Sequence, residues 1–140
     1  MIALTAAMQP EIELIKKSIT EPELIHWQGW DFIKGKLFGE DIVAVQTGVG
    51  KVLAAIVTQK IIDTFSPAAV IMSGVGGSIN PEIKRGDLVI GLDSLQHDMD
   101  ATMFGFKRGQ IPYSDYHIIP SDKKLIEIAL SYKKEKLKQG

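Results

Sequence analysis

Cysteine is absent from the 140 residues, which excludes a disulfide framework, a thiolate nucleophile and a cysteine-ligated zinc site. No apolar run approaches the roughly 20 residues that a membrane-spanning helix requires. The chain carries 16 lysines and arginines against 17 aspartates and glutamates, and this balance argues against nucleic acid or an anionic membrane as the main partner. Residues 1–7 contain no basic side chain and do not resemble a signal peptide. These absences favour a cytoplasmic location.

The composition is that of an ordinary globular domain, with 45% hydrophobic and 24% charged residues. We therefore expect one domain over residues 1–140. Hydrophobic patterning and turn residues predict its elements. These are strands over 2–7, 68–72 and 87–92, helices over 10–17 and 52–65, a hairpin of 30–38 with 42–45 turning at Gly39, a loop over 97–120, and a last helix capped by Ser121 with Leu137 facing inward.

The order of these elements predicts an α/β fold whose mainly parallel, mixed sheet is flanked by helices. Segment 68–72 is apolar without alternation, which is typical of a strand covered on both faces. Helix 52–65 is apolar nearly all round, so we expect it to be buried on two sides. One side would pack on the sheet and the other on a second copy of the chain.

Three short segments follow predicted parallel strands, where open α/β sheets bind their ligands. They are residues 8–11, 47–50 and 73–78, and the last two are rich in glycine. Neither glycine segment has the spacing of a phosphate-binding motif, so each is a weak signal by itself. Glu11 lies in the first turn of a helix, where it complements the helix dipole. The same carboxylate could take a proton from water, although the residues alone favour the structural role.

A polar group of His97, Asp98 and Asp100 opens the long loop. A metal site is conceivable, but the spacing fits no strong template. Hydrogen bonding that pins the loop is the favoured interpretation.

Five segments, taken in order, resemble the 5′-methylthioadenosine/S-adenosylhomocysteine nucleosidases. The resemblance runs from Met1 to about Lys138. Its segments are Ala6-Ala-Met-Gln-Pro-Glu11, Thr47-Gly-Val-Gly-Lys51, Ser73-Gly-Val-Gly-Gly77, Lys84-Arg-Gly-Asp-Leu-Val-Ile90 and the run from His97-Asp98 to Gly109-Gln-Ile-Pro112.

This resemblance implies a fold of the nucleoside phosphorylase/hydrolase type and a homodimer. It also implies hydrolysis of the N-glycosidic bond of an adenine thionucleoside, with release of adenine, in methionine salvage. Family members use no cofactor and no metal. Glu11 corresponds to the carboxylate that activates the attacking water. A carboxylate at this place would repel phosphate, which favours hydrolysis over phosphorolysis.

The resemblance also assigns substrate-binding positions. Met8 lies beneath the ribose, Val49 lies near the 5′-substituent, and Val75, Gly76 and Gly77 line the base and ribose. A second set, Ala101, Phe104 and Pro112, crosses the dimer interface to wall the partner's 5′-alkylthio pocket. Val75 departs from the serine or threonine of many relatives, so one hydroxyl contact is lost.

Family chains are longer, and their second half carries an adenine-stacking Phe, a Met-Glu pair that grips the ribose and an Asp that protonates the base. The resemblance therefore implies that the C-terminal portion of the domain is absent from this sequence. We expect these 140 residues alone to be inactive unless a second chain supplies that portion. The alternatives are a futalosine hydrolase, another purine nucleoside hydrolase or phosphorylase, or a catalytically dead relative that only binds or dimerises.

Overall fold

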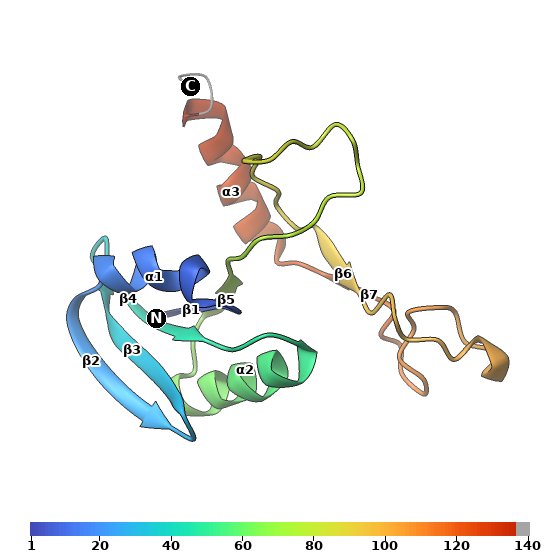
Figure 1. Ribbon diagram of the computed structural model, residues 1–140, viewed down its shortest axis with the longest axis horizontal. Coiled ribbons are helices and arrows are strands. Elements are labelled where there is room, and N and C mark those ends of the chain that lie inside the picture. The colour runs from blue at the N-terminus through green and yellow to red at the C-terminus, as the bar shows by residue number, and fades with distance from the viewer. Residues whose placement is uncertain (137–140) are drawn as a thin grey trace. The chain divides into compact units, whose positions relative to one another are not determined.

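The computed structural model describes the backbone of residues 1–136 and the side chains of residues 1–131. The chain divides into two compact units, residues 1–79 and the part that begins at Asn80. Figure 1 labels the helices and strands of both units. No helix in the described part is long and apolar enough to cross a bilayer.

The first unit is built on a five-stranded sheet with the strand order β2-β3-β4-β1-β5. Strand β1 pairs in parallel with β4 and β5, whereas β3 runs antiparallel to both of its neighbours, β2 and β4. Four strands therefore run in one direction, which confirms the α/β fold with a mainly parallel, mixed sheet. The strand bounds are β1 Ile2–Ala6, β2 Thr20–Trp27, β3 Trp30–Leu37, β4 Glu40–Gln46 and β5 Ala69–Met72.

Helices α1 (Gln9–Ser18) and α2 (Lys51–Phe65) contribute to different core clusters. Alternate residues of β4 enter each cluster, so this strand is buried on both faces, as its continuous apolar sequence predicts. The cluster with α2 contains Ala3, Phe32, Val43, Val45, Val57 and Ile61. The cluster with α1 contains Ala6, Ile12, Ile19, Ile42 and Ala44.

Both predicted helices of this unit are confirmed: α1 is one residue longer at each end than predicted, and α2 begins one residue earlier and ends at Phe65 as predicted. Pro10 stands in the first turn of α1, where a backbone N–H would have no acceptor within the helix, so proline costs no hydrogen bond. Ser66 caps the C-terminus of α2: it adopts a left-handed conformation and donates its N–H to the carbonyl of Ile62 at 3.0 Å. The hairpin at Gly39 is also confirmed, as the antiparallel pair of β3 and β4.

Strand β2 was not predicted from the sequence. Its first five residues are exposed, so no apolar alternation marks it as a strand. It also contains Pro22, which an edge strand tolerates because one side of its backbone has no ladder partner. The segment is a strand because it pairs with β3, and the local residue pattern of the segment does not predict that pairing.

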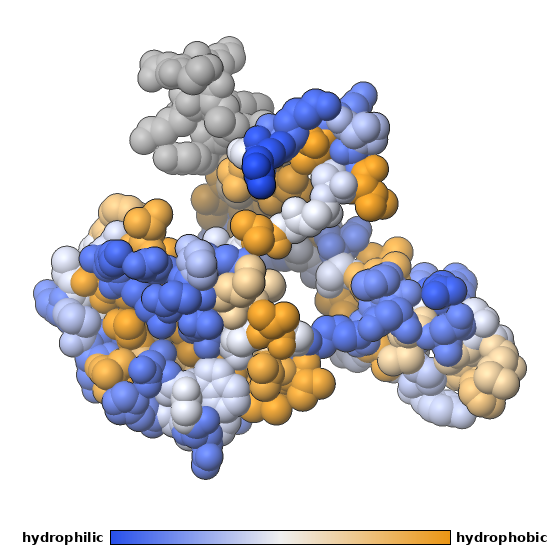
Figure 2. Space-filling model, in the orientation of Figure 1, coloured by the Kyte–Doolittle hydropathy of each residue, from blue (hydrophilic) through white to orange (hydrophobic). Residues whose placement is uncertain are grey.

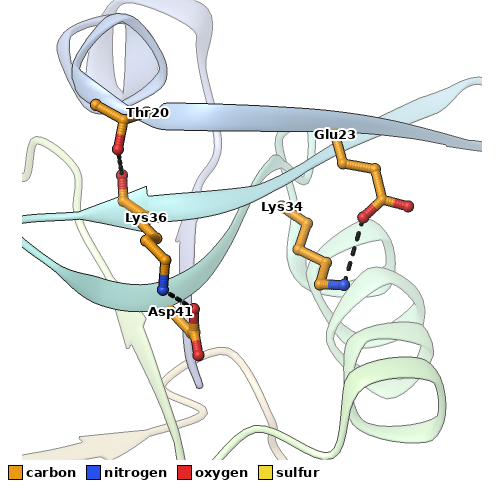
Figure 3. Close-up of polar contacts among 5 residues, drawn as sticks. All are labelled: Thr20, Glu23, Lys34, Lys36 and Asp41. Atoms are coloured by element: carbon orange, nitrogen blue, oxygen red, sulfur yellow. Dashed lines mark hydrogen bonds and ion pairs between the residues drawn. The ribbon is translucent and has the colours of Figure 1, made fainter.

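Polar side chains cross between the strands of this antiparallel layer (Figure 3). Lys34 Nζ lies 3.3 Å from the carboxylate of Glu23 on β2, and Lys36 Nζ lies 2.8 Å from Asp41 on β4. The hydrogen bond from Lys36 lowers the pKa of the Asp41 carboxyl. Exposed pairs of this kind contribute little to stability.

At Gly35, β3 lies close to the backbone at the start of β2. A Cβ atom at this glycine would lie 2.6 Å from the carbonyl oxygen of Thr20 and 2.5 Å from the side chain of Ile19. The pairing register of β2 shifts between Thr20 and Glu23, as at a β-bulge. The glycine therefore makes room for the irregular start of β2.

The prediction that strand 68–72 is covered on both faces is wrong for the described residues. Val70, Ile71 and Met72 are exposed, and β5 is an edge strand of the described sheet, where its one partner is β1. An apolar run marks residues suited to burial, but the neighbours that would cover them come from elsewhere in the fold.

The second unit contains the two-stranded antiparallel sheet of β6 (Asp93–Leu95) and β7 (Ile118–Pro120). The strand predicted over 87–92 is wrong for the described residues, because this segment belongs to no strand ladder there. One backbone hydrogen bond reaches it, from the N–H of Ser121 to the carbonyl of Leu92 at 2.9 Å, and Leu88 and Val89 are exposed. The loop predicted over 97–120 is correct only in part. It holds the single-turn helix η1 (Thr102–Phe104) and ends in β7.

The last helix, α3 (Lys123–Lys136), is present where the sequence predicts it. Asp122 rather than Ser121 supplies the cap, since its carboxylate accepts the backbone N–H of Leu125 at 2.9 Å. Leu137, predicted to face inward, lies outside the described residues.

Candidate active site

The candidate site lies at the carboxyl ends of three neighbouring parallel strands, β4, β1 and β5. The N–H of Thr47, just after β4, donates to the carbonyl of Ala6 at 2.8 Å. The N–H of Ser73, just after β5, donates to the carbonyl of Thr5 at 2.9 Å. These bonds continue the sheet pairing by one step and bring the three predicted loops to one edge.

Glu11 joins two of these loops through its carboxylate. One oxygen, Oε2, accepts the backbone N–H of Met8 at 2.8 Å, so Glu11 caps the helix that it helps to begin. The other oxygen, Oε1, accepts the backbone N–H of Val75 at 3.0 Å. The second bond spans 64 residues. Glu11 therefore does more than complement the dipole of α1.

Backbone N–H groups lower the pKa of Glu11. The hydrogen bond from Val75 is the largest cause, followed by that from Met8, and both stabilise the ionised carboxylate. The side chain is partly exposed. A negative charge therefore stands at the sheet edge at neutral pH, open to solvent on one side.

The segment 47–50 is held at its first residue and exposed at its tip. Thr47 is buried, and its hydroxyl oxygen lies 3.0 Å from the carbonyl oxygen of Gly48 and 3.3 Å from that of Ala6, either of which can accept its one hydrogen. Gly48 has a φ of +90°, a conformation that other residues adopt only with strain. Val49 at the tip is 70% exposed, so it is free to contact a ligand.

The segment after β5 offers an open backbone surface next to Glu11. Gly74 lies so close to the carboxylate that an added Cβ would be 3.1 Å from Oε1. Around Gly76 and Gly77 the space is empty within 4 Å of such an atom. Val75 is 79% exposed and only its backbone is engaged by Glu11.

Six of the nine site residues predicted from the sequence belong to the first unit and lie on its three loops. They are Met8, Glu11, Val49, Val75, Gly76 and Gly77. The other three, Ala101, Phe104 and Pro112, belong to the second unit. Within that unit Ala101 is buried and Phe104 is 71% exposed on η1.

The interpretation that polar residues pin the long loop is supported at Asp100. Its carboxylate accepts both the N–H and the hydroxyl of Thr102, at 3.1 and 2.7 Å, and lies 3.3 Å from the guanidinium of Arg108. The bonds from Thr102 lower the pKa of Asp100. Among the described residues, no three His, Asp or Glu side chains are placed to share a metal ion.

Sequence reasoning missed Trp30, which contacts the site from outside the three loops. Its indole nitrogen donates to the carbonyl of Thr47 at 2.9 Å. A polar hollow of about 310 Å³ borders Trp30, Gly48 and Gln9, but Glu11 does not line it. The candidate site is therefore defined by its loops and not by an enclosed cavity in the first unit.

A comparison of the sequence with models of known protein families identifies the family of this chain. The model of the phosphorylase superfamily matches residues 1–139. The chain belongs to the phosphorylase superfamily. Members of this family therefore provide the comparison for the three loops.

Similar curated proteins are 5′-methylthioadenosine/S-adenosylhomocysteine nucleosidases. One from Tolumonas auensis is 38% identical over 128 residues, which are 91% of this chain and 55% of that protein. One from Staphylococcus haemolyticus is 40% identical over 112 residues, which are 80% of this chain and 49% of that protein. The chain thus spans about half the length of the curated relatives that it matches.

Solved structures of the same kind of enzyme share the fold. The nucleosidase from Colwellia psychrerythraea, in complex with adenine, has a TM-score of 0.93 and 31% identity over 99% of this chain and 57% of its own. The nucleosidase from Neisseria meningitidis, in complex with methylthio-immucillin-A, has a TM-score of 0.90 and 34% identity over 96% of this chain and 59% of its own.

Proposed function

We propose that the protein hydrolyses the N-glycosidic bond of 5′-methylthioadenosine and S-adenosylhomocysteine and releases adenine. The observation that carries the proposal is that the Glu11 carboxylate is held between the start of α1 and the loop after β5. It accepts the backbone N–H of Met8 at 2.8 Å and that of Val75 at 3.0 Å. The names of the similar proteins, and the adenine and nucleoside analogue bound in two of the solved structures, support the same substrate class.

Glu11 acts on water in this proposal. Each carboxylate oxygen can accept more than one hydrogen bond, so an oxygen that already accepts a backbone N–H can still orient a water molecule. Cleavage of a glycosidic bond builds positive charge on the sugar, which a nearby carboxylate stabilises. Because the pKa of Glu11 is lowered, it is a weak base, and orientation and charge stabilisation are its main contributions.

Water is a better nucleophile than phosphate for this site. A phosphate ion beside the ionised Glu11 would be repelled, and phosphorolysis needs cationic groups to offset that charge. Hydrolysis needs a bound water, a carboxylate that orients it and receives its proton as the bond to the sugar forms, and an acid that protonates the departing base. We therefore place the protein among hydrolases of the superfamily.

The remaining site residues are assigned to parts of the substrate. Met8 lies beneath the ribose, Val49 contacts the 5′-substituent, and residues 75–77 line the base and ribose. The exposure of Val49 and the open space around Gly76 and Gly77 are consistent with these roles. No cofactor or metal takes part.

The active protein is a homodimer in this proposal, because α2 has a second apolar face. Val52, Ile56 and Ile62 are exposed on α2, and Figure 2 shows apolar residues gathered over this helix. Exposed apolar patches of this kind mark surfaces that bind another chain. Ala101, Phe104 and Pro112 would then wall the partner's 5′-alkylthio pocket. The alternative partner is a further polypeptide that supplies additional elements of the domain.

The proposed location of the protein is the cytoplasm.

Futalosine hydrolysis is the second candidate reaction. A futalosine hydrolase mutant from Helicobacter pylori has a TM-score of 0.88 and 30% identity over 96% of this chain. The curated relatives described above carry the other name, which favours the adenine thionucleosides. A catalytically inactive protein that only binds or dimerises is the remaining alternative.

Substitution of Glu11 by glutamine tests the proposed function in the protein that carries this chain. We expect kcat for adenine release from methylthioadenosine to fall by roughly 10²–10⁴-fold, the usual effect of losing a group that activates water, whereas KM changes little. Glu13→Gln is the matched control. Glu13 is on the same helix but pairs with Lys17 at the surface.

Near-full turnover of the Glu11→Gln enzyme would remove Glu11 from the mechanism. Release of a base from futalosine, but not from methylthioadenosine, would replace the proposed substrate by the second candidate. Binding of a nucleoside analogue without turnover by the wild-type protein would identify a binding protein.

A further inference from the structure

The indole of Trp30 connects the start of β3 to the candidate substrate loop 47–50. Its Nε1 donates a hydrogen bond to the carbonyl oxygen of Thr47 at 2.9 Å, in partly buried surroundings. Thr47 is the residue directly after β4, and Val49 follows two residues later. A side chain 17 residues earlier in the sequence therefore fixes the first peptide of the loop.

The ring of Trp30 is itself held firmly. It stacks on Trp27, with ring centroids 5.5 Å apart and an angle of 25° between the planes. Both rings pack against the core cluster that includes Phe32 and Ile61. Lys60 of α2 lies 5.3 Å from the centre of the Trp27 ring, a favourable cation–π distance. The donor is thus oriented before any ligand arrives.

The loop needs such an anchor because its backbone is permissive. Gly48 and Gly50 both have positive φ, at +90° and +106°, and glycine occupies many other conformations at little cost. The N–H of Thr47 is bound to β1. The bond from Trp30 holds the carbonyl side of the same residue, from which the loop departs.

We propose that Trp30 is a positioning residue that sets the placement of Val49 and thereby the preference for the nucleoside's 5′-substituent. The proposal rests on the proposed function, in which Val49 contacts that substituent. Trp30 acts through the loop and does not itself touch the substrate. An apolar, bulky 5′-group such as methylthio depends on the position of Val49 more than a small 5′-hydroxyl does.

Trp30→Phe tests the proposal, because phenylalanine keeps an aromatic ring for the stack and removes the hydrogen-bond donor. Trp27→Phe is the matched control, since it alters the same stack and leaves the bond from Trp30 to Thr47 in place. Two measurements are made on the protein that carries this chain. One is amide hydrogen exchange of residues 48–51, and the other is the kinetics of adenine release from methylthioadenosine and from adenosine.

We expect loop exchange in Trp30→Phe to be roughly two- to tenfold faster, the effect of one neutral hydrogen bond. KM for methylthioadenosine should rise by a similar factor while kcat changes less than twofold, and KM for adenosine should change less. Trp27→Phe should leave the exchange of the loop and the ratio of the two KM values unchanged.

Unchanged loop exchange in Trp30→Phe, or equal effects of the two variants on exchange and KM, would overturn the proposal. An equal rise of KM for both nucleosides would overturn its specificity for the 5′-substituent. If the wild-type protein releases adenine from neither nucleoside, the proposed function fails, and hydrogen exchange alone still decides whether Trp30 holds the loop.

Discussion

The two adjacent isoleucines of α2 offer a sharp test of how this helix packs. Ile61 is fully buried in the core cluster, whereas Ile62 is 45% exposed. Substitution by alanine removes three side-chain carbons at either position. At about 0.8 kcal/mol for each buried carbon, together with a cavity that the surroundings fill only in part, Ile61→Ala should lower the free energy of unfolding by about 3 kcal/mol.

The same change at Ile62 should lower the free energy of unfolding by about 1 kcal/mol in the single chain, since half of its side chain is already in water. Urea unfolding at two protein concentrations measures both effects. The cost of Ile61→Ala should not depend on concentration. The cost of Ile62→Ala should rise with concentration if a second copy covers this face. Equal, concentration-independent costs for the two variants would refute the burial pattern and the proposed dimer face together.

Three further predictions concern backbone fit, capping and pH. Gly35→Ala should lower the free energy of unfolding by about 2–3 kcal/mol, because the new Cβ meets a backbone carbonyl that cannot move away; thermal melting should show a smaller loss for Gly39→Ala, where only the positive φ opposes alanine. Asp122→Ala should destabilise α3 by about 1 kcal/mol in urea unfolding, and Ser121→Ala by much less, since only Asp122 accepts a helix N–H among the described contacts. Glu11 has a folded-state pKa below its ordinary value of 4.5, so its stabilisation is present above that pH and is lost as the pH falls through the folded-state pKa; stability plotted against pH should be less steep in acid for Glu11→Gln.

Much of the local structure could be predicted because it depends on residues close together in the sequence. Helix α1 is identified by the helical spacing of its apolar residues and by the proline and glutamate in its first turn. Helix α2 is identified by a long apolar run that is followed by Ser-Pro. The turn at Gly39 between two apolar segments identifies the hairpin of β3 and β4. The place of Glu11 in the first turn of a helix after a strand is also a local feature, but its assignment to water activation rests on the family resemblance, because the local pattern by itself favours a structural role.

Tertiary structure decided what depends on partners far away in the chain. Strand β2 exists because β3 pairs with it, and residues 87–92 form no strand in the described part because no strand there forms a ladder with them. The second hydrogen bond of Glu11 reaches Val75, 64 residues later, and Trp30 reaches the loop at Thr47. A local pattern states which side chains prefer burial and which conformations the backbone favours. Which groups meet across the sheet, and so which residues orient the candidate site, follows only from how the strands are ordered.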